Sequence, residues 1–407
     1  MRRVILLALL QCAVLGALTA PAVVGLSVMI NGMTTPADAP ATLAMAITVG
    51  GVAAMAASTL FGWISDRTRA RRKWLVSGAV IGMALSTVLP FTTTPLMLAA
   101  VWGLTQIAYN ACFAAINGLV SEGLDARERT RASGLFSAAA FIGTLPGLAV
   151  AALFPSQVVL VSLVVPAATT VVVLVVARRI QESPITASSS SKLPGSGVRE
   201  VITRRFLSVL LLRMMISMEL TAGLIFALYL FMSRWDLSEA EAVRLVSAST
   251  LLGAVGIVLS SLTVAATRIR LLDARVLLSA ALLVLVAAML LRGLADSVAV
   301  FVLATGMAGM AIGVGMTATR SLAHAALPPD RSALGLGVLG VANSLGGIIA
   351  PPVASALLIA GGSMGIIDDY AGMYVLLVLP IAACLALIPG TLRASSRRPP
   401  KTPSPVA

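Results

Sequence analysis

One acidic residue lies far inside an apolar segment of the chain. Glu219 falls near the middle of the apolar run 206–232, and Arg213 precedes it by six residues. Burying charge in hydrocarbon is unfavourable, so an ionisable side chain at this depth is a candidate functional group. Six residues turn a helix by roughly 600°, so we do not expect the two side chains to pair.

Glu219 is therefore the candidate for carrying a coupling proton or contacting a solute. The alternative is an acid that packs against a neighbouring helix or lies close enough to the surface to be hydrated. Arg213 is either a residue of the same cavity or one whose long side chain reaches back to the membrane surface.

A second group of polar residues shares one helix face. Gln106, Tyr109 and Asn110 are spaced i, i+3 and i+4 within an apolar run, so their side chains lie together. Amides and a phenol facing a cavity suit a hydroxyl-rich ligand, whereas the alternative is hydrogen bonding between helices. Gln11 and Asn343 are further candidates for the lining of a cavity.

The residues needed for familiar catalytic chemistry are missing. Cys12, Cys112 and Cys384 are far apart in apolar runs, and His324 is the single histidine. No metal-ligand spacing, redox pair or Gly-x-x-x-x-Gly-Lys phosphate loop occurs. We therefore expect no enzyme activity, no cofactor, no metal and no direct use of ATP.

The composition explains what positions these residues. Of the 407 residues, 58% are hydrophobic and only 11% are charged, so lipid must surround most of the surface. A spanning helix needs about 20 apolar residues. Twelve such runs are present, at 4–30, 41–64, 74–92, 95–120, 131–153, 156–177, 206–232, 242–266, 274–292, 296–322, 332–359 and 370–392.

The charges between these runs predict the topology. Nearly all of the 29 Lys and Arg residues fall on one side if both termini are cytoplasmic, as the positive-inside rule requires. Arg234, Arg244 and Arg292 fall in loops on the other side. This distribution explains the net charge of +13 without nucleic acid. The first run, after Arg2 and Arg3, also resembles a cleavable signal peptide, but it is longer than a signal core.

An internal repeat predicts two halves of six helices. Three features recur at a constant offset of 203 residues, just before and within the fifth and eleventh runs. They are Leu124–Arg127 with Leu327–Asp330, Gly134 with Gly337, and Gly143 with Gly346. We expect an N-terminal bundle over 1–177, a cytoplasmic linker over 178–205, a C-terminal bundle over 206–392 and a disordered tail over 393–407.

The loop between the second and third runs gives the most specific motif. It reads Gly62-Trp-Ile-Ser-Asp66-Arg67-Thr-Arg-Ala-Arg71-Arg-Lys and resembles the signature loop of the major facilitator superfamily. The resemblance implies an all-α fold of twelve transmembrane helices in two bundles. It also implies a conformational latch, for which the candidates are Gly62, Asp66, Arg67, Arg71 and Arg131. Arg69 replaces the family's second Gly, and 267–275 lacks the Asp-Arg pattern, so the latch is expected on one side only.

The amino-acid sequence of this loop is similar to that of the sugar-cation symporter branch. The resemblance implies a secondary transporter that takes up a sugar-like solute with a proton or cation by alternating access. Export of a metabolite or drug stays open, because the helices expected to line the cavity are apolar. From other classes, a non-transporting membrane sensor also stays open, whereas a membrane-embedded enzyme lacks its catalytic residues.

The expected partners are a small-molecule substrate, protons or cations and the lipid bilayer, with no nucleic acid. We expect a monomer in the inner (cell) membrane of a bacterium, with both termini cytoplasmic. Lysine is almost absent, being found only at Lys73, Lys192 and Lys401, which is typical of a GC-rich bacterial genome.

Overall fold

The computed structural model describes residues 2–68, 70–123, 139, 142–180, 203–266, 273–327 and 332–388. Within these ranges the chain forms helices joined by short turns. Large apolar side chains point outward, among them Leu259 at 59%, Leu303 at 65% and Leu379 at 64% exposure. A water-soluble protein rarely exposes so much apolar surface, so this exterior suits hydrocarbon.

The first half of the chain carries the following helices: α1 (Arg2–Ala20), η1 (Pro21–Gly25), α2 (Leu26–Asn31), α3 (Ala39–Thr68), α4 (Arg71–Val88), η2 (Leu89–Phe91), α5 (Pro95–Gly123), α7 (Thr144–Leu153), η3 (Pro155–Gln157) and α8 (Val158–Arg179). They follow the first six predicted runs in order. The fifth run, predicted over 131–153, is represented by α7 and by isolated residues before it, and its remainder lies outside the described residues.

The second half carries α10 (Arg204–Ile225), α11 (Ala227–Arg234), α12 (Glu239–Ala266), α13 (Ala274–Gly293), α14 (Val298–Ala326), α15 (Ser332–Gly362) and α16 (Asp369–Leu387). These match the last six predicted runs within a few residues at most ends. In the part of the chain that the structure describes, ten helical segments are long and apolar enough to cross a membrane.

Two of the described membrane segments are interrupted within their length. The first contains a π-helical stretch, η1, that begins at Pro21 and joins α1 to α2. The seventh is interrupted at Phe226, between α10 and α11. Such irregular backbone is tolerated at membrane depth where protein rather than lipid surrounds it. Both interruptions lie close to the cavity described below.

The repeated glycines make equivalent contacts in the two halves. A Cβ at Gly143 would collide with the backbone of Cys12 in α1, and one at Gly346 would collide with the backbone of Met214 in α10. Each glycine therefore lets the helix of its repeat lie directly against the first helix of its own half. This contact explains why Gly occurs at both positions of the repeat.

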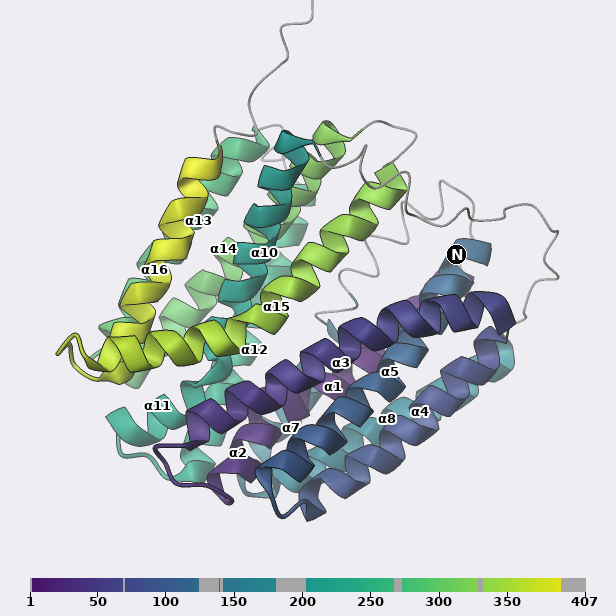
Figure 1. Ribbon diagram of the computed structural model, residues 1–407, viewed down its shortest axis with the longest axis horizontal. Coiled ribbons are helices and arrows are strands. Elements are labelled where there is room, and N and C mark those ends of the chain that lie inside the picture. Colours follow the sequence, from purple (N-terminus) through teal and green to yellow (C-terminus); the bar gives the residue numbers. More distant parts are fainter. Residues whose placement is uncertain are drawn as a thin grey trace, which may run out of the picture.

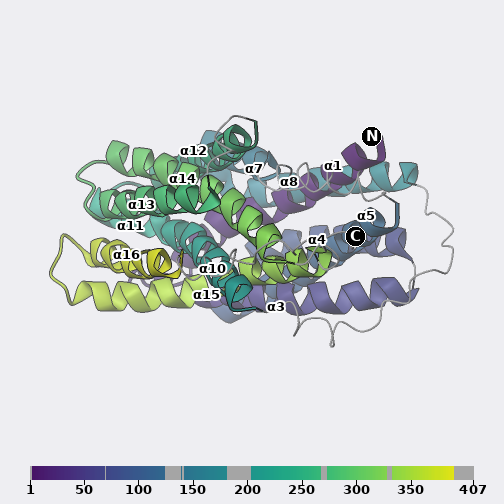
Figure 2. The same ribbon diagram turned by 90° about the horizontal axis from the view of Figure 1, so that it is seen from above.

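The halves lie side by side and meet mainly through two pairs of helices. Figures 1 and 2 show α1, α3, α4, α5, α7 and α8 in one group and α10–α16 in the other. Between the groups, α3 packs against α15 and α7 packs against α12. These are the second and eleventh, and the fifth and eighth, of the predicted runs, so the two contacts are related by the internal repeat.

The molecule has two chemically different ends. The end at which α3 ends and α10 begins, called the basic end here, carries most of the Lys and Arg residues that the structure describes. The opposite end holds the turns 32–38 and 235–238 and is closed by contacts between the halves. Asn31 donates a hydrogen bond from Nδ2 to Glu239 at 2.7 Å, and the Tyr229 hydroxyl donates to the carbonyl of Ser27 at 3.2 Å.

The helices of the two halves are less closely packed at the basic end. Among the described residues, no atom outside the glycine's own helix backbone lies within 4 Å of the position that a Cβ would take at Gly62 in α3, or at Gly337 and Gly340 in α15. Further along the same two helices a Cβ at Gly51 would lie 2.8 Å from Ile348. Figure 1 shows the two groups diverging toward the end of the molecule at which the N-terminus lies. The described residues thus form a structure that is closed at one end and open at the other.

Candidate functional site

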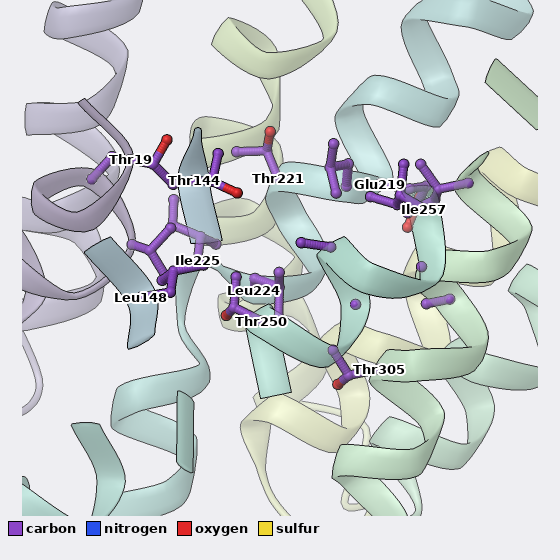
Figure 3. A pocket seen from close by; sticks show the side chains of 18 of the residues that line it. Thr19, Thr144, Leu148, Glu219, Thr221, Leu224, Ile225, Thr250, Ile257 and Thr305 are labelled. Atoms are coloured by element: carbon purple, nitrogen blue, oxygen red, sulfur yellow. The ribbon is translucent and has the colours of Figure 1, made fainter. Parts of the chain in front are cut away.

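A cavity of about 280 Å³ lies between the two halves, at the level of the C-terminal part of α10. In Figure 3, Thr19, Thr144 and Leu148 of the first half face Thr250, Ile257 and Thr305 of the second. The walls are mainly Ala, Val, Ile, Leu and Gly, and most lining residues belong to α10, α12 and α14. This volume is near the lower end of the range for small-molecule sites.

Glu219, the coupling candidate predicted from the sequence, lines this cavity. The side chain is 1% exposed and belongs to the residues that line the cavity. Neither Oε1 nor Oε2 has a hydrogen-bond partner in the described part of the chain. A buried carboxylate normally has partners, because losing its hydration is unfavourable. These two oxygens are therefore available to a proton or a ligand.

Arg292 lines the same cavity. The sequence predicts a position in a loop on the outer side, but Arg292 occupies the last turn of α13 and its side chain is only 3% exposed. It makes no ion pair with Glu219 within 4.0 Å, and its Nε has no partner among the described residues. A single arginine next to Gly293 at the end of an apolar run looks like an ordinary interfacial residue, so the sequence carries no signal for its burial.

The backbone of α10 holds Arg292 in place. Its Nη1 donates to the carbonyl of Gly223 at 3.1 Å, and the Tyr374 hydroxyl donates to the same carbonyl at 2.9 Å. Carbonyls in the last turn of a helix lack partners from their own helix, so this one can accept both bonds. A Cβ at Gly223 would collide with the guanidinium. The absence of a side chain at 223 thus creates the space in which Arg292 lies.

An ion pair behind the cavity fixes the end of α13. Arg234 donates from Nε and Nη2 to the two carboxylate oxygens of Asp368, both at 2.6 Å. Its Nη1 donates to the backbone carbonyls of Arg292 and Gly293. Burial alone would raise the pKa of the Asp368 carboxyl, but the bonds from Arg234 and from the Ala371 N–H lower it below its ordinary value.

The threonines of the cavity mostly donate to their own helices. Thr19 donates to the Leu15 carbonyl at 2.9 Å and Thr305 donates to the Phe301 carbonyl at 2.9 Å. Their hydroxyl oxygens can therefore accept a hydrogen bond from a ligand but have no free proton to give. The Thr250 hydroxyl has no partner among the described residues and can do either.

Two of the other predicted cavity residues bond to each other within the second half. The Arg213 Nε donates to Asn343 Oδ1 at 3.0 Å, and its Nη1 donates to the Met316 carbonyl at 3.0 Å. Ser217 adds a bond to the Asn343 carbonyl at 2.7 Å. This group connects α10, α14 and α15 and is not part of the cavity lining. Substrate contact by Arg213 or Asn343 stays a prediction.

The polar face of α5 is also separate from this cavity. Tyr109 is fully buried with its ring against Gly82 of α4, and Asn110 donates from Nδ2 to the Gln106 carbonyl in its own helix at 2.8 Å. Gln11 in α1 is half-buried. None of these four residues belongs to the cavity lining, and a role for them in another conformation stays a prediction.

The candidate latch residues are described in part. Arg71 is 5% exposed, donates to the Ser65 hydroxyl at 2.7 Å and lies against Gly118 of α5. Arg67 is exposed and its guanidinium lies 5.5 Å from the centre of the Trp63 ring. Among the described residues, no atom of another helix lies within 4 Å of a Cβ placed at Gly62. The side chain of Asp66 and all of Arg131 lie outside the described residues, so the latch stays a prediction.

The described residues contain no group of three or more His, Cys, Asp and Glu side chains placed to hold a metal ion. The site that they do form has a different character: a largely aliphatic cavity lined by two buried residues of opposite charge, Glu219 and Arg292. Such a cavity between two related helical bundles is the usual place of a substrate in transporters.

Comparison with known proteins decides the family. The family model of the major facilitator superfamily matches residues 4–272, which is more than half of the chain. The chain belongs to the major facilitator superfamily. The resemblance inferred from the loop at Gly62 is thereby confirmed, and so is the expected fold. None of the curated proteins matches the chain.

Solved structures agree on the fold. The nucleoside transporter NupG has a TM-score of 0.77 at 15% identity, over 97% of this chain and 100% of that one. A D-xylose-proton symporter has a TM-score of 0.69 at 14% identity, over 96% and 98%. A bacterial homologue of the human lysosomal transporter Spinster, in an inward-facing and unoccupied conformation, has a TM-score of 0.67 at 17% identity, over 96% and 95%.

These proteins are transporters and not enzymes, which agrees with the expectation of no enzyme activity. At such low identity they establish the architecture of this major facilitator, and they leave its substrate to be argued from its own cavity.

Proposed function

We propose that this protein is a secondary active transporter that moves a small organic solute through the central cavity by alternating access, with Glu219 carrying a coupling proton. The observation that carries the proposal is a carboxylate that is 1% exposed, lines a cavity between two bundles and has no partner on either oxygen among the described residues. A group in that position can bind a proton when the cavity faces one side and release it when the cavity faces the other.

The packing of the two halves supports the alternating part of the proposal. The opposite end is closed by Asn31 with Glu239 and by Tyr229 with Ser27, while Gly62 and Gly337 at the basic end have open space beside them. The two main helix contacts between the halves, α3 with α15 and α7 with α12, are related by the internal repeat, so rocking one half on the other would exchange the open and closed ends. This conformation then corresponds to a cavity facing the basic end.

The basic end is proposed to be cytoplasmic. The cations there follow the positive-inside rule, which places both termini in the cytoplasm of a bacterial cell. A monomer suffices for this mechanism, because the cavity is formed within one chain.

Two classes of solute are compatible with the family. The wording of the loop at Gly62 favours uptake of a sugar-like solute. The cavity itself favours a more apolar molecule, since its walls are largely aliphatic and the amides of Gln106 and Asn110 are not among them. We give the second class precedence, because the lining contacts the solute and the loop does not.

The test is solute-driven proton movement in proteoliposomes, with a panel of sugars and small amphipathic solutes. We expect at least one solute to drive proton flux in the wild type, and the variant Glu219→Gln to bind that solute without moving protons. The matched control is Glu241→Gln, since Glu241 is exposed and accepts hydrogen bonds from Ser238 in its own turn. Equal proton flux in wild type and Glu219→Gln would show that Glu219 does not carry the proton. Solute uptake that depends on Na⁺ in place of a proton gradient would identify a cation-coupled carrier.

A further inference from the structure

The two buried charges of the cavity constrain what it can bind. Glu219 and Arg292 are the charged residues of the lining, and they are 1% and 3% exposed. They do not form an ion pair within 4.0 Å of each other, but an ionised Glu219 balances the charge of Arg292 in the empty cavity. Uncompensated charge on side chains buried this deeply is strongly unfavourable, so the loaded cavity must also be close to neutral.

Other titratable groups near Glu219 do not alter this balance. Tyr374 and Cys384, both in α16, are the other side chains that interact electrostatically with Glu219 in the described structure, and both are neutral in their usual form. Further away, Arg234 and Asp368 form an ion pair of their own. The net charge of the cavity is therefore set by Glu219, Arg292 and the ligand.

The charge of each possible ligand can be compared with the proton that Glu219 is proposed to carry. An organic cation adds a positive charge that no group in the cavity can offset. A zwitterion or a neutral solute leaves the cavity neutral only while Glu219 stays ionised, so it takes no proton with it. An organic monoanion adds one negative charge, and protonation of Glu219 removes one, so the cavity is neutral both empty and loaded.

The hydrogen-bonding groups of the cavity point to the same class. Arg292 Nε and the Thr250 hydroxyl have protons without an acceptor, and a protonated Glu219 adds a third donor. The hydroxyls of Thr19 and Thr305 already donate hydrogen bonds to backbone carbonyls of their own helices. Free donors suit an anionic acceptor such as a carboxylate, while the aliphatic walls suit an apolar body.

We infer that the substrate is a small, largely apolar organic monoanion of the carboxylate class, which Arg292 binds and which enters together with one proton on Glu219. This inference rests on the proposed transport function and specifies its substrate. One proton and one monoanion cross together, so the transport cycle moves no net charge. The proton comes from solution on one side, resides on the Glu219 carboxylate, and leaves to solution on the other.

Binding to the purified full-length protein tests the ligand class without any need for transport. The probes share one skeleton: 3-phenylpropanoate, its amide, the amine 3-phenylpropylamine and the permanently charged 3-phenylpropane-1-sulfonate. We expect the two anions to bind at least tenfold more tightly than the amide or the amine. Equal or tighter binding of the amine or the amide overturns the inference.

The affinity of the sulfonate also reports on the proton that Glu219 binds, because the sulfonate itself stays ionised at every pH of the measurement. If one proton enters with each anion, its affinity rises by about tenfold for each unit by which the pH falls, over the range in which Glu219 is ionised in the empty protein. The variant Glu219→Gln is expected to bind the sulfonate with no such slope. A slope that persists in this variant overturns the assignment of the proton to Glu219.

Arg292→Gln is expected to lose binding of both anions, with Arg244→Gln as the matched control at an exposed arginine of the same end of the molecule. If Arg292→Gln does not fold, Arg292→Lys retains the positive charge and should bind the sulfonate with the pH slope of the wild type. Anion affinity unchanged in folded Arg292→Gln overturns the inference.

Flux measurements separate this inference from the proposed function. In proteoliposomes, a pH gradient should drive uptake of the sulfonate, and a membrane potential set with potassium and valinomycin should leave the initial rate unchanged. If sugars or neutral solutes drive protons and anions do not, the transport function stands and the substrate class is wrong. If anions bind through Arg292 and nothing moves protons, the binding site stands and coupling is wrong.

Discussion

Gly223 determines where the Arg292 side chain can lie. The guanidinium crosses α10 at this glycine, four residues after Glu219, and donates to its carbonyl at 3.1 Å. Any side chain at this position would occupy the space of the guanidinium. The distance between the two buried charges thus depends on a residue that has no charge and no side chain.

The variant Gly223→Ala tests this dependence. The added methyl group forces Arg292 out of its position, so we expect anion binding to fall by at least tenfold and the protein to lose about 1–3 kcal/mol of stability, as overpacked sites do. Ligand binding and thermal unfolding in detergent measure the two effects. Gly347→Ala is the control, because the nearest atom to its Cβ would be Thr221 Oγ1 at 3.7 Å. Unchanged binding in Gly223→Ala would show that Arg292 does not need this position.

Individual residues of the site differ in how far the sequence predicts them. Glu219 stands out because an acid in an apolar run is rare. Arg292 does not, because an arginine at the end of such a run usually reaches the membrane surface. Arg213 and Asn343 look like cavity residues by their polarity, but they are bonded to each other across α10 and α15. Polarity identifies residues that need partners, and only packing decides what the partner is.

The ends of α11, α13 and α16 are joined by a single ion pair. Arg234 ends α11 and bonds the last carbonyls of α13, while Asp368 precedes α16 and accepts from the Ala371 N–H at 2.7 Å. The pair is partly buried, with side-chain exposures of 6% and 25%. The pair holds the backbone from which Arg292 projects, so its loss should change the position of Arg292 in the cavity.

We expect Asp368→Asn to lower the stability of the protein by about 1.5–3 kcal/mol, since it removes hydrogen bonds to a charged group. The pKa of Asp368 is lower in the folded chain than its ordinary value of 3.8. Its contribution is therefore complete above about pH 4 and disappears as the pH falls through the depressed value.

Thermal unfolding in detergent as a function of pH measures this contribution. The wild type should lose stability below about pH 4 more steeply than Asp368→Asn. Asp369→Asn is the control, because Asp369 is exposed and receives no bond from Arg234. Equal pH dependence in the wild type and Asp368→Asn would contradict the role assigned to the pair.

The order and limits of the elements follow from the sequence for physical reasons. Hydrocarbon requires about 20 apolar residues for each helix, and the runs near 41–64 and 242–266 correspond to α3 and α12 within a few residues. The π-helical stretch at Pro21 and the interruption at Phe226 could not be predicted, because a continuous apolar run continues through both. Neighbouring helices support this irregular backbone, and the sequence of a single segment does not show which helices pack against it.

The conformation of the whole molecule can be measured between the two helices that diverge at the basic end. Gly62→Cys and Gly337→Cys, in a chain lacking Cys12, Cys112 and Cys384, would carry spin labels at positions with open space around them. Binding of substrate with a proton should shift the distance distribution between the labels toward shorter values, because alternating access closes the basic end. Electron–electron double resonance measures this shift.

Removing a contact at the opposite end should shift the same distribution. Glu239→Ala removes the bond from Asn31, worth about 1 kcal/mol at a partly exposed charged group, which changes the ratio of the two conformations by roughly fivefold toward the shorter distance. Glu241→Ala, which removes only the two local bonds from Ser238, should leave the ratio unchanged. A distribution that responds neither to substrate nor to Glu239→Ala would contradict alternating access in this molecule.

The unequal contribution of the halves to the cavity has a consequence for how this protein can change its specificity. The second half supplies most of the wall and both buried charges, and Arg292 lies beyond residue 272, where the match to the family description ends. Under selection for a new solute, adaptive substitutions should accumulate in α10 and α12–α14. The first half should vary more freely, because it needs only to remain compatible with the second half. Hybrids that combine it with the second half of another carrier should therefore have the substrate specificity of that carrier.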